Sequence, residues 1–140
     1  MMRQQIGRLP VQTGGRGFYD ISAQVQDQVT QSRIQSGLCT LHLQHTSASL
    51  LIQENADPDV RRDFEVFFAK LVPDGDRMFI HTAEGEDDMP AHIRAALTTV
   101  NLSVPVDNAR LVLGMWQGIY VWEHRREPHR RVVVCHVLGE

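Results

Sequence analysis

Three of the seven histidines in this sequence occupy positions from which an imidazole could bind a metal ion or transfer a proton. His45 ends the run 39–45, in which apolar and polar side chains alternate, so it is predicted to end the apolar face of a strand. His81 precedes the acidic run 84–88, and His92 lies in the first turn of a predicted helix. The unperturbed pKa of imidazole, about 6.5, lets a modest shift select either protonation state. We expect the polar chemistry of the folded chain to converge on a histidine-and-carboxylate cluster centred on His45, His81 and His92, in one recess.

A structural role is the alternative for each histidine. His42 and His129 are predicted to be solvated, and His136 is predicted to be a core histidine on a strand face rich in valine. For His45 the alternative is a core imidazole capped by the hydroxyls that follow it. Neither H-E-x-x-H nor C-x-x-C occurs, so spacing along the chain does not by itself identify a metal site.

Carboxylate and amide side chains provide a second set of candidates. Gln117 and Glu123 flank an apolar pair on one face of a predicted strand, so both are expected to point inward. A buried carboxylate is costly unless it is paired, and four arginines lie between positions 125 and 131. An ordinary salt bridge therefore explains Glu123 as well as a catalytic role does.

Alternating and helical periodicities predict an α+β fold. Helices are expected from Asp20, from Pro58 to Leu71 and from Pro90. The buried stripe of the second helix is expected to consist of Val60, Phe64, Phe67, Phe68 and Leu71. Strands are expected over residues 4–13, 39–45, 50–52, 78–82, 102–106, 110–113, 118–123 and 131–138. We predict about three helices packed on a mainly antiparallel sheet, or on two sheets.

Length and composition limit the number of domains and the kinds of partner that the chain can have. At 140 residues, 42% of them hydrophobic and with no repeat or linker, the chain is expected to form a single domain over residues 1–140. The net charge of −3 argues against a nucleic-acid partner, which would usually require a strongly basic face. The longest apolar run, residues 132–138, is far shorter than the ~20 residues that span a bilayer, so no membrane partner is expected. Cys39 and Cys135 are expected to be small buried thiols, and reduced thiols together with a polar start that lacks an export signal favour the cytoplasm.

Five separate motifs, in this order along the chain, resemble those of the YjbQ family. They are His45–Leu50 (HTSASL), Glu54–Val60 (ENADPDV), Glu84–Ile93 (EGEDDMPAHI), Gly114–Gly118 (GMWQG) and Glu123–Arg125 (EHR). Met115 departs from the family pattern, which usually has threonine before the Trp-Gln pair. The resemblance implies a compact α+β fold similar to that of trimeric relatives, and a thiamine-phosphate synthase activity. It also implies a divalent metal bound by His45, His81 and His92, with Glu54, Asn55, Gln117, Glu123 and Arg125 around it.

These candidates lead to two functional hypotheses. The first is a metal-assisted enzyme acting on a phosphorylated small molecule, in which a divalent ion and arginines neutralise an anionic leaving group such as pyrophosphate. Imidazole ligands favour zinc over magnesium, which prefers oxygen ligands. The second is a non-catalytic oligomer, expected to be a homotrimer, that binds a metal or a metabolite; a purely structural oligomer is a further alternative. For the enzyme, the candidate catalytic groups are His45, Gln117 and Glu123, and the candidate substrate-binding groups are Thr46, Ser47, Glu54, Asn55, Arg125 and Arg130.

Overall fold

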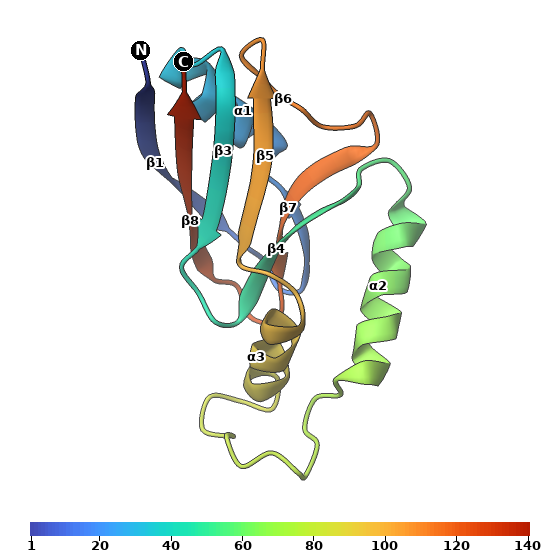
Figure 1. The fold of residues 1–140 in the computed structure, drawn as a ribbon. Coiled ribbons are helices and arrows are strands. Elements are labelled where there is room, and N and C mark those ends of the chain that lie inside the picture. Colours follow the sequence, from blue (N-terminus) through green and yellow to red (C-terminus); the bar gives the residue numbers. More distant parts are fainter.

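The computed structural model describes all residues from 1 to 140 and contains three helices and two antiparallel sheets (Figure 1). The helices are α1 (Ser22–Ser32), α2 (Pro58–Leu71) and α3 (Asp88–Leu97). The strands are β1 (Arg3–Gln12), β2 (Gly17–Asp20), β3 (Ser36–Leu43), β4 (Ala48–Glu54), β5 (Asn101–Asp107), β6 (Arg110–Leu111), β7 (Gln117–Glu123) and β8 (Arg130–Gly139). This arrangement confirms the predicted α+β class with three helices and two sheets.

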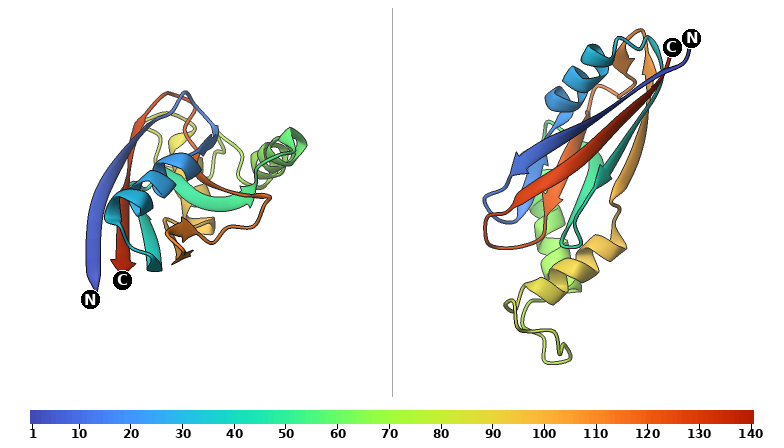
Figure 2. Two further views of the ribbon diagram at one scale, coloured as in Figure 1. Left: turned by 90° about the horizontal axis from the view of Figure 1, so that it is seen from above. Right: turned by 90° about the vertical axis from the view of Figure 1, so that its left-hand side faces the viewer.

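The core lies between the two sheets. The larger sheet has the strand order β1-β8-β3-β5-β6, and Figure 2 shows its long strands side by side in one layer. The smaller sheet has the order β2-β7-β4. Alternate residues of β3 and β8, including Leu41 and Val133, point toward the smaller sheet and are fully buried, as period two requires. The apolar face of α1, with Val25 and Val29, closes the same core.

One prediction about the larger sheet is wrong, namely the core position of His136. His136 was expected in the core, but it lies on the outer face and pairs with Gln4 at 2.9 Å. Its neighbours along β8, Val133 to Val137, alternate between the two faces, and Cys135 takes the core position instead. His42 is exposed, as predicted, and bonds Asn101.

The helix α2 begins as predicted, because Asp57 accepts a hydrogen bond from the backbone N–H of Asp59 and Pro58 occupies the first turn. Its predicted buried stripe is only partly correct. Phe64 and Phe68 pack against an aromatic cluster of Phe18, Tyr120 and Trp122. Phe67 and Leu71 are 61% and 54% exposed, because α2 touches the body of the protein along one narrow edge (Figure 1).

Residues 72–87, here called the connecting segment, join α2 to α3. A second prediction is wrong in this segment. The expected strand at 78–82 is absent, because no neighbouring strand is present to complete a ladder. The backbone N–H of Phe79 instead donates to the carbonyl of Asp76 in a turn, and Ile80 is almost fully exposed. The third helix begins at Asp88 rather than at Pro90. The short strand β2 was missed because its four residues follow a glycine-rich turn.

A buried ion pair joins the two sheets at one end of the core. Glu123, at the end of β7, accepts from the Nε of Arg131 on β8 at 2.8 Å and from the hydroxyl of Thr13 at 2.7 Å. Its second oxygen accepts from the backbone N–H groups of His124 and Arg125, each at 3.1 Å. Burial by itself raises the pKa of Glu123, but the hydrogen bonds from Arg131 and Thr13 outweigh it and lower the pKa below its ordinary value. The expected salt bridge of Glu123 is thus present and fully buried.

Replacing Arg131 by leucine should lower the free energy of unfolding by about 3–5 kcal/mol, because it leaves the Glu123 carboxylate buried without a cation. Urea denaturation followed by circular dichroism measures this loss. The matched control is Arg130→Leu at the neighbouring exposed position, where the change should stay within about 0.5 kcal/mol. Equal losses in the two variants would show that the ion pair does not hold the sheets together.

Candidate metal centre

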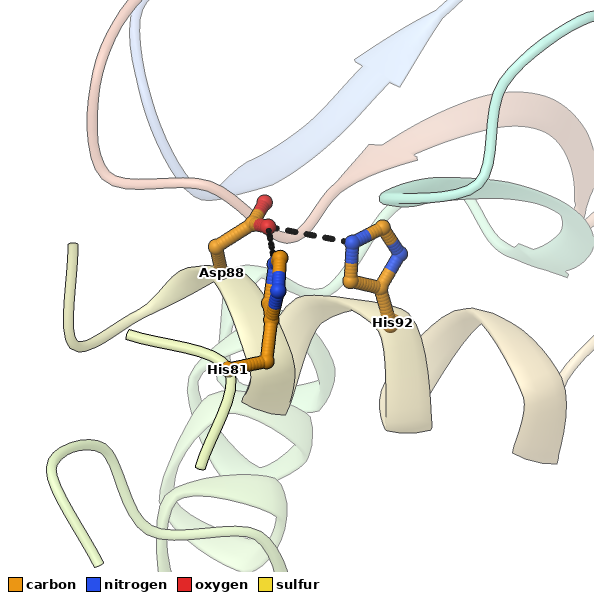
Figure 3. Close-up of side chains that lie close together, drawn as sticks. All are labelled: His81, Asp88 and His92. Carbon is orange, nitrogen blue, oxygen red and sulfur yellow. Dashed lines mark hydrogen bonds and ion pairs between the residues drawn. The ribbon is translucent and has the colours of Figure 1, made fainter. Parts of the chain in front are cut away.

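Two of the predicted histidines meet at the side chain of an aspartate (Figure 3). Asp88 and His92 are four residues apart on α3 and therefore share one helix face, and His81 comes from the connecting segment. Oδ2 of Asp88 lies 2.6 Å from Nε2 of His81 and 3.0 Å from Nε2 of His92. The three groups present one nitrogen or oxygen atom each within 4.8 Å of one another. This spacing allows all three atoms to bind one metal ion.

Asp88 is held in place from its other oxygen. Oδ1 pairs with Nη1 of Arg125 at 2.8 Å, and the same guanidinium bonds Asp87 through Nε at 2.9 Å and the carbonyl of Glu84 through Nη2 at 2.8 Å. Burial by itself raises the pKa of Asp88, whose side chain is 2% exposed, but the hydrogen bond from His81 and the charges of His92 and Arg125 lower it below its ordinary value. Asp88 is therefore an ionised carboxylate at neutral pH, with Oδ2 directed at the two imidazoles.

The ring of His92 has a defined proton position. Its Nδ1 lies 2.8 Å from the backbone carbonyl of Thr46, which can only accept, so Nδ1 carries a proton. In the neutral ring Nε2 then carries a lone pair, and it faces the carboxylate oxygen of Asp88 at 3.0 Å. Two acceptors at this distance require a cation between them, which is either a second proton on His92 or a metal ion.

His45 does not join this cluster. It lies two residues beyond the end of β3, and its Nε2 accepts the backbone N–H of Val132 at 2.9 Å. Its Nδ1 lies 3.4 Å from Nη1 of Arg131. Burial lowers the pKa of His45, and the charge of Arg131 lowers it further. His45 is thus a neutral imidazole whose Nε2 is already engaged by the backbone.

Two recesses adjoin the cluster. His92 and His45 line an open, mostly apolar recess of about 400 Å³ together with Thr46, Ala95, Ala96 and Val100. His81 lines a polar recess of about 360 Å³ together with Gly75, Asp76, Arg77, Phe79, Thr82 and Glu86. Glu86 is paired with Arg126 at 2.6 Å, whereas Arg77 is exposed and makes no ion pair. A ligand bound at the cluster therefore has an apolar recess on the His92 side and a free guanidinium on the His81 side.

Five other predicted site residues lie at this end of the molecule. Ser47 is buried and accepts from the Arg131 guanidinium, which also holds Glu123. Arg125 binds the aspartates of α3, and Thr46 contributes its carbonyl to His92. Arg130 is exposed on β8 and makes no side-chain bond. Glu123 and Arg125 thus have every strong hydrogen-bonding position occupied within the chain, so they shape the site rather than face a ligand.

The remaining predicted site residues lie elsewhere. Strands β4 and β7 are antiparallel, with Ala48 opposite Glu123 at one end and Glu54 opposite Gln117 at the other. Six steps of about 3.3 Å along β4 separate these ends by about 20 Å. Gln117 is exposed rather than inward-facing, and Asn55 lies beside it. A small ligand at the histidines of one chain therefore does not reach Glu54, Asn55 or Gln117 of that chain.

Asp88 is the member of this cluster that the sequence analysis did not single out. In the sequence it is the last residue of the acidic run 84–88. Its spacing from His92, four residues on a helix, was the available signal, because that spacing places both side chains on one face. Because the helix was predicted to begin at Pro90, Asp88 was not recognised as part of the same helix as His92.

One buried histidine remains outside the cluster. His124 is fully buried, and its Nε2 lies 2.9 Å from the hydroxyl of Ser49, which is equally buried. Its Nδ1 has no partner. Burial lowers the pKa of His124 to about 3, and the charges of Arg94, Arg16 and Arg131 act in the same direction. This serine–histidine pair is closed to solvent and therefore serves the core.

Sequence and structure comparisons place these features in context. The family described as UPF0047 protein YjbQ-like matches residues 8–140. A UPF0047 protein of Synechocystis sp. is 51% identical over 99% of this chain and 94% of its own length. The UPF0047 protein YjbQ of Escherichia coli O157:H7 is 41% identical over 94% of this chain and 96% of its own length. A solved YjbQ/UPF0047 protein from Clostridium acetobutylicum, described as uncharacterized, has a TM-score of 0.85 and 34% identity over 93% of this chain and 98% of its own. A protein of unknown function from Sulfolobus solfataricus has the same fold, with a TM-score of 0.91 and 23% identity over the full length of both chains.

None of the three helices has the length and apolar character that crossing a lipid bilayer requires.

The free energy of unfolding should fall as the pH is lowered from about 6.5 to about 5, because His124 takes up a proton readily only in the unfolded chain. The folded pKa is the lower one, so the stabilisation is complete above the unfolded value of about 6.5 and is lost progressively toward the folded value of about 3. Each such histidine contributes a slope of at most about 1.4 kcal/mol per pH unit, and His45 adds to it in the same direction. Urea midpoints at several pH values measure the slope. His124→Gln should reduce it, and an unchanged slope in that variant would contradict the assignment.

Proposed function

The chain belongs to the UPF0047 YjbQ-like family, and we propose that it is a metal-dependent enzyme acting on a phosphorylated small molecule. The observation that carries this proposal is the pair of acceptors formed by His92 and Asp88. Because Thr46 takes the Nδ1 proton, Nε2 of His92 faces the ionised Oδ2 of Asp88 at 3.0 Å. A divalent cation bound by both groups and by His81 satisfies this arrangement without a second proton on His92.

The donor set favours zinc. Two imidazole nitrogens and one carboxylate oxygen match the ligands that zinc takes in catalytic sites, whereas magnesium prefers oxygen ligands alone. Three protein ligands leave one position open for water or substrate. The surroundings also fit a metal ligand set, because the Thr46 carbonyl orients His92 and Arg125 orients Asp88. When bound, such an ion polarises a phosphoryl or leaving-group oxygen.

The adjoining recesses support a phosphorylated substrate. Arg77 is the exposed, unpaired cation of the recess that His81 lines, and a guanidinium binds phosphate oxygens in a bidentate manner. The recess on the His92 side is lined by Ala95, Ala96 and Val100 and would take an apolar or ring-shaped body. His45, on the wall of that recess, would orient this body, because its Nε2 lone pair is taken by the backbone N–H of Val132 and is not free to accept a proton.

The synthesis of thiamine phosphate is one reaction of this class. It joins a pyrimidine diphosphate to a thiazole phosphate and releases pyrophosphate, whose charge requires neutralisation as the carbon–oxygen bond breaks. A non-catalytic homotrimer that binds a metal or a metabolite is the second candidate. It is favoured by the exposed apolar side chains Phe67, Met78 and Ile80, which a neighbouring chain would cover.

Protein purified without a histidine tag should contain about one zinc ion per chain, measured by inductively coupled plasma mass spectrometry. Asp88→Asn and His92→Asn should each reduce the bound metal at least tenfold, because they remove a ligand or its charge. His45→Asn should retain the metal and lose turnover, measured as pyrophosphate released from the two thiamine precursors.

The matched control for metal content is His129→Asn, which changes a histidine outside the cluster. Full turnover by metal-free protein would overturn the metal-dependent mechanism. If phosphorylated compounds raise the melting temperature but are not consumed, the second candidate replaces the enzyme.

Arg77→Ala should raise the KM for a phosphorylated substrate about tenfold, or its Kd if the protein only binds it, with the metal content unchanged. The loss of one charge-assisted contact of about 1.4 kcal/mol corresponds to this factor. Arg62→Ala, an equally exposed change on α2, should leave KM unaffected. Equal effects of the two variants would remove Arg77 from the phosphate site.

A further inference from the structure

The turn that precedes β7 lies beside the Glu54 end of β4 and exposes a tryptophan to solvent. Trp116 is 60% exposed, whereas Trp122, the other tryptophan of the chain, is 1% exposed. Its neighbour Met115 is 80% exposed. Large apolar side chains exposed together on a surface mark a binding site more often than isolated ones do. Neither the metal centre nor the core uses this side chain.

The turn that carries Trp116 is firmly held. The side-chain amide of Asn55 donates to the carbonyls of Met115 and Gln117 at 3.2 and 3.3 Å, and its backbone N–H donates to the carbonyl of Trp116 at 3.0 Å. Within the turn, Oε1 of Gln117 accepts from the backbone N–H of Gly114 at 2.8 Å, and the Gln117 N–H donates to the Gly114 carbonyl at 3.1 Å. The turn is therefore ordered with the indole exposed, so the backbone of the turn loses little conformational entropy when a ligand binds.

An open recess of about 480 Å³ lies beside the indole and is lined by Ile52, Gln53, Glu54, Val60, Trp116 and Gln117. The carboxylate of Glu54 makes no ion pair, and the N–H₂ groups of Gln53 and Gln117 make no hydrogen bond within the chain. The recess therefore combines a flat aromatic face with one ionised acceptor and two amide donors. These groups suit a ring that carries both donors and acceptors on its edge.

The charge of this end disfavours phosphate. Asp57 and Asp59 lie at the start of α2, close in sequence to the lining residues Glu54 and Val60. Glu54 is the only charged residue that lines the recess, and with Asp57 and Asp59 nearby it repels an anion and attracts an amino-bearing or cationic group. The guanidinium of Arg61 on α2 is engaged by the hydroxyl and the ring of Tyr120. An electron-poor ring over the face of an indole gains further from stacking. This recess thus takes a different ligand from the one that the Arg77 recess would take.

We propose that the Trp116 recess is a second binding site, which takes a nitrogen heterocycle bearing an exocyclic amino group. The ring stacks on the indole of Trp116, its amino group donates to the carboxylate of Glu54, and the amides of Gln53 and Gln117 donate to ring acceptors. The site lies about 20 Å from the metal centre along β4, as the strand rise gives. It therefore does not depend on the proposed enzymatic function.

Titration of the protein with adenosine tests this site through the two indole N–H resonances in ¹H–¹⁵N NMR spectra. The resonance of Trp116, assigned by its loss in Trp116→Leu, should shift with adenosine, and that of the buried Trp122 should stay unchanged. Uridine, which lacks the amino group, and adenosine monophosphate, which carries a phosphate, should each bind at least fivefold more weakly. Chelation of metal or the change His92→Asn should not alter the titration.

Glu54→Gln should weaken adenosine binding about tenfold, and Glu127→Gln, an exposed change away from the recess, should not alter it. Unchanged backbone spectra confirm that both variants are folded. The proposal is overturned if the Trp116 resonance does not move at millimolar adenosine, or if Glu54→Gln and Glu127→Gln bind equally well. It is also overturned if that resonance depends on protein concentration alone, since a second copy of the chain then covers the indole.

Discussion

The buried pair of Glu123 and Arg131 is the interaction on which the site end of the molecule depends. It joins β7 of the smaller sheet to β8 of the larger one, so the two layers meet at a defined separation. The same carboxylate accepts the backbone N–H of Arg125 and thereby directs the chain that leaves β7. From there the guanidinium of Arg125 reaches Asp88. The buried carboxylate of Glu123 thus positions Arg125, which in turn positions the carboxylate of Asp88. Both contacts are charge-assisted hydrogen bonds.

The connecting segment shows why such ion pairs are needed. Residues 72–87 contain no helix or strand, so no backbone ladder holds His81 near α3. Asp74 pairs with Arg16, Glu86 with Arg126, and Asp87 with Arg125, which fastens the segment to the turns at the ends of the sheets. Opposite charges hold the later part of this segment where apolar packing does not, because Met78 and Ile80 are exposed instead of buried. The position of His81 beside Asp88 and His92 follows from these pairs.

The two ends of β4 carry different chemistry. The end near Ala48 adjoins histidines, an ionised aspartate and a free arginine, which suits a metal and an anion. The end near Glu54 presents an indole, amides and unpaired carboxylates, which suits an uncharged or cationic ring. Strand β4 pairs with β7 along its whole length, which keeps its two ends about 20 Å apart. Ligands bound at the two proposed sites would therefore not compete.

Periodicity along the chain predicted the three helices, most of the strands and most of the faces that enter the core, and it placed Glu123 among the buried groups. It also predicted the caps of α2 and the α+β class, because these depend on neighbours within one element. Tertiary structure alone decided that Asp88 rather than His45 stands with His81 and His92, and that Glu54, Asn55 and Gln117 lie at the far end of β4. It also left residues 78–82 without a partner strand. The reason is physical: spacing in sequence measures distance only within an element, whereas distances between elements follow from strand pairing, sheet packing and the ion pairs that join them.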